Sequence, residues 1–151
     1  MSRVDFYHLQ KQSLDEVLPK LLLKAYASGK HILVKIGNEE RIEQINSYLW
    51  TFQDESFLPH GSKKDGFAAE QPIWLTSQND NPNEAQFLFL TEGAECEVEK
   101  LASYERIFNI FDGNSEVALT QARKLWKEYK ENGCEVFYWQ QSDSGKWEQK
   151  A

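Results

Sequence analysis

The sequence predicts an α/β domain built around a mostly parallel sheet. Segments rich in β-branched and aromatic residues alternate with segments whose apolar residues recur at helical spacing, and the order strand, helix, strand, helix matches a βαβα unit. The run 30–36 has a continuous apolar centre, which is typical of a strand buried in a parallel sheet. With 151 residues the chain has the usual length of one domain, so we expect a single domain over 1–151, its sheet flanked by helices.

The first half of the chain contains two predicted strands and two predicted helices. Strands are expected at 4–9 and 30–36, and helices at 13–28 and 39–49. Gly29 is placed to end the first helix and Asn38 to cap the second. Pro19 conflicts with the first helix, because proline lacks an amide donor and clashes with the preceding turn. Either the regular helix starts near Leu18 or it is kinked.

The second half continues the alternation after a less regular stretch. Further strands are expected at 72–76, 86–90, 106–111 and 134–139. A short helix is expected to begin near Lys100, and a long helix lies between the turn 112–115 and Gly133. The segment 61–70 is polar and is expected to be a mobile loop, and the polar tail 140–151 is expected to fray.

Four large apolar side chains between the second helix and position 60 follow neither helical nor strand spacing. They are Trp50, Phe52, Phe57 and Leu58. Because loops normally run over the protein surface, two interpretations remain open. The side chains form a satellite of the core, or they form an exposed apolar patch that binds a partner.

The long helix near the carboxyl end combines an apolar arc with a basic, aromatic face. The residues of the arc and its edge are Ala118, Ala122, Leu125, Tyr129, Leu119 and Trp126. Beside them Arg123, Lys127 and Lys130 form a cationic stripe, whereas Lys124 points elsewhere. The stripe is either an ordinary solvated helix face or a surface that holds an acidic peptide with an apolar anchor.

Charge and composition narrow the class of protein. The formal net charge of −7 disfavours general nucleic-acid binding, which needs many cations facing phosphates. Cys96 and Cys134 form no metal-binding or redox spacing, and we expect both to be reduced. The amino-terminal residues lack the apolar run of a signal peptide, and no segment approaches the ~20 apolar residues of a membrane span. We therefore expect a soluble, cytoplasmic protein that contacts no membrane.

Motifs of catalysis and cofactor binding are missing from the sequence. It contains no phosphate-binding loop, dinucleotide-binding fingerprint or nucleophile elbow. The histidines His8, His31 and His60 lack the spacing of a metal site and are more simply structural or surface residues. Missing motifs do not exclude an enzyme, because catalytic groups are defined by geometry. The residues nevertheless give enzymatic activity no positive support, and we expect no cofactor and no metal.

Four stretches of the chain resemble the chi subunit of bacterial DNA polymerase III holoenzyme. They are 6–9, 29–34 with 39–41, 49–60 and 122–130. The resemblance implies a Rossmann-like three-layer fold without a bound nucleotide, and no catalytic activity. It also implies pairing with the psi subunit, which links this family to the clamp loader. Finally, it implies binding of the acidic, Phe-terminated carboxyl-terminal tail of single-stranded DNA-binding protein, with only indirect contact to DNA.

The resemblance assigns residues to two surfaces. The residues assigned to the tail of single-stranded DNA-binding protein are Arg123, Lys127, Trp126, Lys130 and Phe111, the last as a weaker candidate. A lysine that some family members carry at the start of this helix is apolar here, near Leu119. The residues assigned to docking psi, and helicase-like repair proteins in some bacteria, are Trp50, Phe57, Pro59 and His60. For Phe57 and Pro59 a place in the core stays open as the alternative.

Three functions are therefore weighed. The first is a non-catalytic binding module that tethers the polymerase assembly to protein-coated single strands. The second is a nucleotide-dependent or nucleic-acid-processing enzyme, which an α/β fold allows but does not establish. The third is a direct single-strand binder that uses Trp126, Tyr129 and the lysines, which the net charge disfavours.

Overall fold

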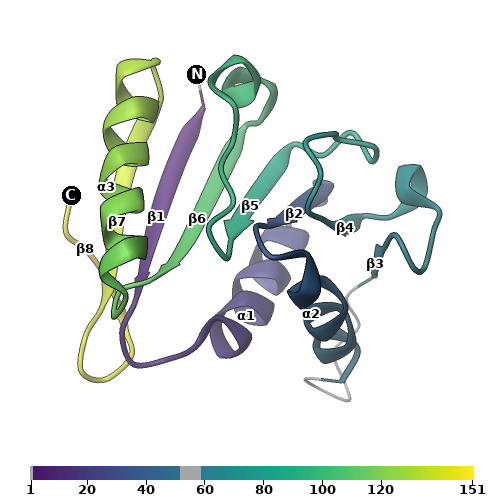
Figure 1. Ribbon diagram of the computed structural model, residues 1–151, viewed down its shortest axis with the longest axis horizontal. Coiled ribbons are helices and arrows are strands. Elements are labelled where there is room, and N and C mark those ends of the chain that lie inside the picture. The colour runs from purple at the N-terminus through teal and green to yellow at the C-terminus, as the bar shows by residue number, and fades with distance from the viewer. Residues whose placement is uncertain (1, 52–58) are drawn as a thin grey trace.

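The computed structural model of the protein describes residues 2–51 and 59–151 (Figure 1). Within them one eight-stranded sheet has the order β3-β4-β2-β5-β6-β1-β7-β8. The strands are β1 Arg3–Leu9, β2 Ile32–Ile36, β3 His60–Ser62, β4 Ile73–Thr76, β5 Phe87–Thr91, β6 Arg106–Asp112, β7 Glu135–Gln141 and β8 Trp147–Gln149. The helices are α1 Leu14–Tyr26, α2 Glu39–Thr51 and α3 Glu116–Glu131, with short 3-10 turns η1 Ala68–Glu70 and η2 Val98–Ser103.

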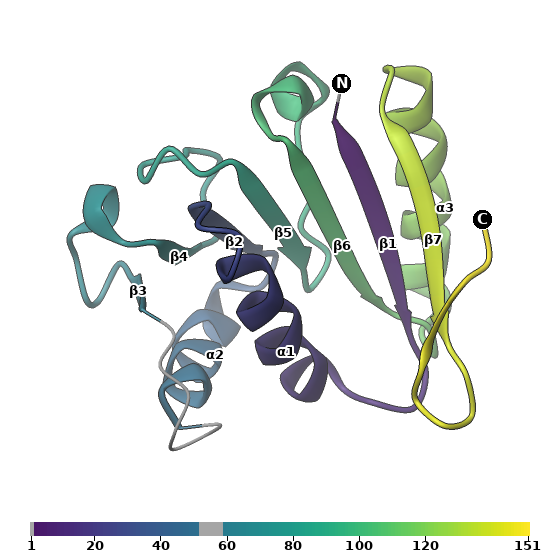
Figure 2. The ribbon, with the colours of Figure 1, turned by 180° about the vertical axis from the view of Figure 1, so that it is seen from behind.

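The sheet is parallel throughout, apart from the antiparallel pair β7–β8 at one edge. Helix α3 lies in front of the sheet in Figure 1, and α1 lies in front of the opposite face in Figure 2. Each face carries its own apolar core: Leu18, Leu22 and Ile45 pack on one face, and Leu125 and Tyr129 on the other. The predicted α/β class and its mostly parallel sheet are confirmed.

Helix α1 is formed by its cap and its apolar face, in spite of a proline in its interior. The main-chain amide of Ser13 donates to Glu16 Oε1 at 3.3 Å, which closes one arm of a capping box. The helix begins at Leu14, so a start near Leu18 is wrong. Pro19 lies inside the helix and is buried.

The segment after position 60 differs from the predicted mobile loop. His60–Ser62 pairs with β4 as an edge strand, and Asp65 fixes the turn that follows. The carboxylate of Asp65 accepts hydrogen bonds from the Ser62 amide at 3.0 Å and from the Asn46 side chain at 2.8 Å. These hydrogen bonds lower the pKa of Asp65, because they favour its charged form.

The carboxyl-terminal tail, which was expected to fray, instead forms β8. Trp147 of β8 lies opposite Gln141 of β7, and its ring meets Tyr7 edge-on with 5.1 Å between ring centroids. The amide of Tyr138 also donates to the carbonyl of Ala151 at 3.1 Å. An aromatic anchor and main-chain hydrogen bonds to β7 therefore hold a segment whose polar composition predicted fraying.

Candidate functional site

Helix α3 carries the predicted cationic stripe on an ordered support. Ser115 caps the helix, because its hydroxyl oxygen accepts a hydrogen bond from the Ala118 amide at 3.2 Å. Ala122, Leu125 and Tyr129 are buried against the sheet, as predicted. Tyr129 is fully buried, and its hydroxyl accepts the Cys96 amide at 3.1 Å. The exposed side of α3 is therefore held in a fixed position relative to the sheet.

An apolar notch lies between α3 and the carboxyl end of β6, beside β7. Its volume is about 340 Å³, and it is lined by Phe111, Leu119, Ala122, Arg123, Trp126, Tyr138 and Ala151. The rings of Trp126 and Tyr138 meet edge-on with 6.1 Å between centroids, and Phe111 lies 6.1 Å from Tyr138. Apart from the Arg123 side chain and the Tyr138 hydroxyl, the lining side chains are apolar, so the notch suits an aromatic or aliphatic group.

The cationic stripe of Arg123, Lys127 and Lys130 is exposed beside this notch. Within the described residues none of the three forms an ion pair, so their charges remain available to a partner. Burial raises the pKa of Tyr138, and the charge of Arg123 partly opposes this. Arg123 is therefore close enough to the floor of the notch to influence a group held there.

The structure brings together only part of the predicted tail-binding set. Arg123, Trp126 and Phe111 line one notch, whereas Lys127 and Lys130 continue the stripe outside it. Sequence reasoning missed Tyr138 as a notch residue, although the alternation along 134–139 placed it on the same face as Val136. It also missed Leu119 and Ala151 as lining residues, and Ala151 is there because the tail is ordered.

His8 lies beneath the notch and supports its floor. Its Nδ1 is hydrogen-bonded to the Tyr138 hydroxyl, and its ring is 5.3 Å from Phe111. Burial lowers the pKa of His8, although the neighbouring main chain of Gly113 and the charge of Asp112 oppose the shift. A Cβ atom at Gly113 would lie 1.8 Å from Cδ2 of the His8 ring, so only glycine fits there.

The second predicted surface lies at the other edge of the sheet, on α2 and β3. Trp50 is 49% exposed and Tyr48 is 38% exposed. His60 is only 2% exposed, and its ring lies under Trp50 with 4.2 Å between centroids. Pro59 is half-buried. Phe57 lies outside the described residues, as do Phe52 and Leu58.

The exposure of Trp50 is consistent with the exposed-patch interpretation, whereas His60 is buried beneath the Trp50 ring. The Nε2 of His60 is 3.1 Å from the carbonyl oxygen of Asn46, which ties β3 to α2. The tilted contact of the His60 ring with Trp50 supports the indole from below without exposing the imidazole. The surface therefore presents Trp50 and Tyr48, with His60 beneath Trp50.

Two absences hold for residues 2–51 and 59–151, which the structure describes. Among them no group of three or more His, Cys, Asp and Glu side chains is arranged to hold a metal ion. Nor does the described part of the chain include a helix with the length and apolar character needed to cross a membrane.

The fold is that of a Rossmann-like α/β protein, and its candidate site is an apolar notch beside exposed cations. The chain belongs to the DNA polymerase III chi subunit family: the family described as "DNA polymerase III chi subunit, HolC" matches residues 1–137. The chain is therefore related to subunits of the bacterial replicative polymerase.

Two relatives agree with this assignment. The chain is 28% identical over 109 residues to the "Probable DNA polymerase III subunit chi" of Rickettsia prowazekii (strain Madrid E), covering 72% of this chain and 66% of that protein. It is 30% identical over 78 residues to the "DNA polymerase III subunit chi" of Pseudomonas aeruginosa, covering 50% of this chain and 54% of that protein. The matches thus span just under two thirds and about half of the lengths of these relatives.

Proposed function

We propose that this chain is a non-catalytic accessory subunit that tethers the replicative polymerase to protein-coated single strands. It holds the acidic, Phe-terminated tail of single-stranded DNA-binding protein on α3, and it pairs with the psi subunit through the α2–β3 surface. Contact with DNA is indirect. The family assignment supports the first part of the proposal, and the geometry of the notch supports tail binding.

The observation that carries tail binding is an apolar notch directly beside unpaired cations. A terminal Phe ring would enter the notch among Trp126, Tyr138 and Phe111, where aromatic pairs are favourable. The terminal carboxylate would receive charge-assisted hydrogen bonds from Arg123, whose planar guanidinium suits a carboxylate. Acidic residues earlier in the tail would lie along Lys127 and Lys130. Each feature of such a tail therefore has a counterpart on this surface.

A single short tail of this kind gives only modest affinity. Several tails displayed on one oligomer raise the effective concentration of the second and later contacts. Part of the attraction is electrostatic between exposed charges, so added salt should weaken it. The proposed tether is consequently strong on coated single strands and weak on the free peptide.

The first prediction concerns Arg123. Arg123→Ala should weaken binding of a short acidic peptide ending in Phe by about tenfold or more, because a charge-assisted pair to the carboxylate is lost. The measurement is fluorescence anisotropy with a labelled peptide, with the same peptide amidated at its carboxyl end as a ligand control. Lys124→Ala is the matched protein control, since Lys124 is exposed on the same helix but does not line the notch.

Pairing with the psi subunit is measured on the same variant. Arg123→Ala should leave it intact, because Arg123 is not on the α2–β3 surface. If Arg123→Ala and Lys124→Ala weaken the peptide equally, the notch is not the tail site. If peptide binding and psi pairing fall together, the variant is misfolded, which a melting curve reveals.

The second prediction concerns Trp50. Exposed aromatic residues are the usual anchors of protein interfaces. Trp50 is half exposed, and its ring packs on the buried ring of His60. Trp50→Ala should reduce affinity for the psi subunit by about tenfold or more and leave peptide binding on α3 unchanged. A helicase-like repair protein that uses the same surface should lose affinity in parallel.

Phe67→Ala is the matched control for this surface, since Phe67 is 77% exposed. Isothermal titration of purified psi subunit into each variant measures the effect. The assignment of the two surfaces is wrong if Trp50→Ala weakens the acidic peptide and leaves psi pairing normal. The same protein is also titrated with ATP and with an oligonucleotide. Binding of ATP would favour a nucleotide-dependent enzyme, and binding of the oligonucleotide would favour a nucleic-acid-processing enzyme or a direct single-strand binder.

A further inference from the structure

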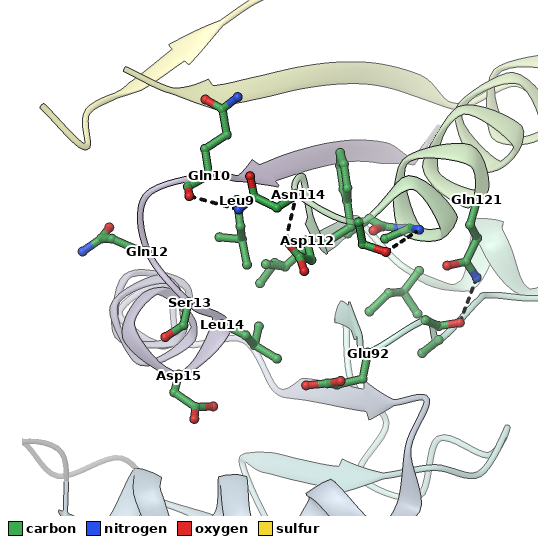
Figure 3. Close-up of a pocket in the computed structure, with 18 of the residues that line it drawn as sticks. Leu9, Gln10, Gln12, Ser13, Leu14, Asp15, Glu92, Asp112, Asn114 and Gln121 are labelled. Atoms are coloured by element: carbon green, nitrogen blue, oxygen red, sulfur yellow. Dashed lines mark hydrogen bonds between the residues drawn. The ribbon is translucent and has the colours of Figure 1, made fainter. Parts of the chain in front are cut away.

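A second cavity lies at the carboxyl ends of the strands, where the chain leaves neighbouring strands in opposite directions. From β1 the chain passes through α1 to β2, and from β6 it passes through α3 to β7, although β1 and β6 are adjacent. Open α/β sheets bind ligands at such switch points. The cavity has a volume of about 770 Å³ and is lined by the loops after β1, β5 and β6 (Figure 3).

A largely buried side-chain amide lines this switch-point cavity. Asn109 of β6 is 5% exposed, and its position between Ile107 and Phe111 along the strand places it on the α3 face. Among the described residues its side chain has no hydrogen-bond partner, and its polar atoms are not fully enclosed, so they meet the solvent of the cavity. A ligand that offers one donor and one acceptor can therefore replace this solvent.

The charges around the cavity favour a basic ligand. Four carboxylates line it, those of Asp15, Glu16, Glu92 and Asp112, against the two cations Lys11 and Arg41, which leaves a formal charge of −2. Figure 3 shows Asp15 on one side, with Glu92 from the loop after β5 and Asp112 from the end of β6. Arg41 is already engaged, because it donates to Asp15 at 2.8 Å and to Glu92 at 3.0 Å.

The two helix N-termini at the cavity do not make it an anion site. The first turns of both helices already carry carboxylates, which neutralise the positive potential of the helix N-termini. These are Asp15 and Glu16 in α1 and Glu116 in α3. The Ser115 cap also engages the Ala118 amide of α3. A phosphate or nucleotide would therefore meet carboxylates rather than open amides.

We propose that the switch-point cavity binds a short basic peptide segment of a partner protein. The main chain of the segment supplies one C=O and one N–H, which pair with the Asn109 amide in place of solvent. An arginine or lysine side chain then reaches the carboxylates at the rim, Asp112 foremost because it has no ion pair within the described residues. The volume falls in the range of sites for small ligands.

The test is a titration followed by NMR of the ¹⁵N-labelled full chain. The probe is acetyl-Gly-Arg-Gly-amide, and the comparison probes are acetyl-Gly-Glu-Gly-amide and adenosine monophosphate, all at millimolar concentration. The arginine peptide should shift the side-chain NH₂ signal of Asn109 and the main-chain signals of 92–94 and 112–115. Asn109→Leu and Asp112→Asn should each weaken it about fivefold or more. Arg123→Ala should leave it unchanged, which separates this site from the notch.

Three results would overturn the proposal: no shift by the arginine peptide, shifts at these signals by the glutamate peptide or the nucleotide, or equal affinity in Asn109→Leu. A melting curve guards against misfolding of that variant.

Discussion

His8 packs against the floor of the notch, and its protonation makes the stability of the fold depend on pH. Its Nδ1 is hydrogen-bonded to Tyr138, while its Nε2 is buried without a partner in the described residues. A protonated imidazole needs partners for two N–H groups, and this pocket favours the neutral ring. The lowered pKa of His8 has desolvation by burial as its main cause.

This shift predicts a pH dependence of stability. The unfolded chain binds a proton at His8 near pH 6.5, whereas the folded chain binds it only at lower pH. As the pH falls through about 6.5, protonation therefore favours the unfolded state, and the free energy of unfolding decreases until the folded-state pKa is reached. Urea unfolding at several pH values between about 5 and 8 measures the effect. This range brackets the ordinary histidine pKa of about 6.5.

The control for this prediction is His8→Gln, which keeps a polar side chain and removes the titrating group. Its stability should change less between pH 7.5 and 5.5 than that of the unaltered protein, because the shift at His8 is gone. If His8→Gln shows the full slope, the acid sensitivity comes from another group.

At the scale of elements, Tyr129 joins α3 to the segment that precedes η2. The side chain is fully buried, and its hydroxyl accepts the amide of Cys96. Burial raises the pKa of Tyr129 well above its usual range, and the hydrogen bond from Cys96 opposes the shift. One hydroxyl group thus satisfies the main chain of a neighbouring loop and fixes the helix that carries the cationic stripe.

Tyr129→Phe should therefore destabilise the protein by about 1–3 kcal/mol, because it leaves the Cys96 amide buried without an acceptor. Tyr48→Phe is the matched control: Tyr48 is 38% exposed, and its loss should change stability by no more than about 0.5 kcal/mol. Chemical denaturation measures both. An equal, small effect for the two variants would show that the Cys96 amide finds water or another acceptor.

The long elements were predictable from sequence because their signals are local. The spacing of Ala122, Leu125 and Tyr129 determines which face of α3 is buried, and the apolar run of β2 indicates a parallel strand. Both hold in the structure. Short edge strands carry no such signal. His60–Ser62 and Trp147–Gln149 become strands only because β4 and β7 offer them a free edge.

The candidate sites were predictable only in part, for the same reason. The stripe on α3 lies within one helix, so its spacing reveals it. The notch also needs Phe111 from β6 and Tyr138 from β7, and their proximity depends on where α3 crosses the sheet. The cavity around Asn109 depends on three loops that are distant in sequence. No local pattern in a single sequence predicts that residues so distant in the chain line one cavity.

At the scale of the molecule, the two proposed surfaces lie near opposite ends of the sheet. β3 is at one edge and β7 is next to the other, six strand positions away. At about 4.8 Å between strands this separates the surfaces by roughly 30 Å. Figure 1 shows the same arrangement, with α3 and α2 at the two ends of the sheet. A short peptide in the notch would therefore lie away from the α2–β3 surface.

We therefore predict independent binding. The affinity for the acidic peptide should change by less than about twofold when the psi subunit is present at saturation, since couplings of 1–3 kcal/mol would give about fivefold or more. Anisotropy titrations with and without psi measure this. A larger change in either direction would show that the two surfaces are coupled through the sheet.

The strand order has a consequence for the chain as it leaves the ribosome. β1 is the first strand made, yet its two neighbours in the sheet are β6 and β7. No partner for Val4 or Phe6 exists until synthesis has passed Asp112, which takes roughly 5–20 s at bacterial rates. During that interval an apolar strand is available to chaperones and to other nascent chains. Cotranslational folding of this protein must therefore be completed late.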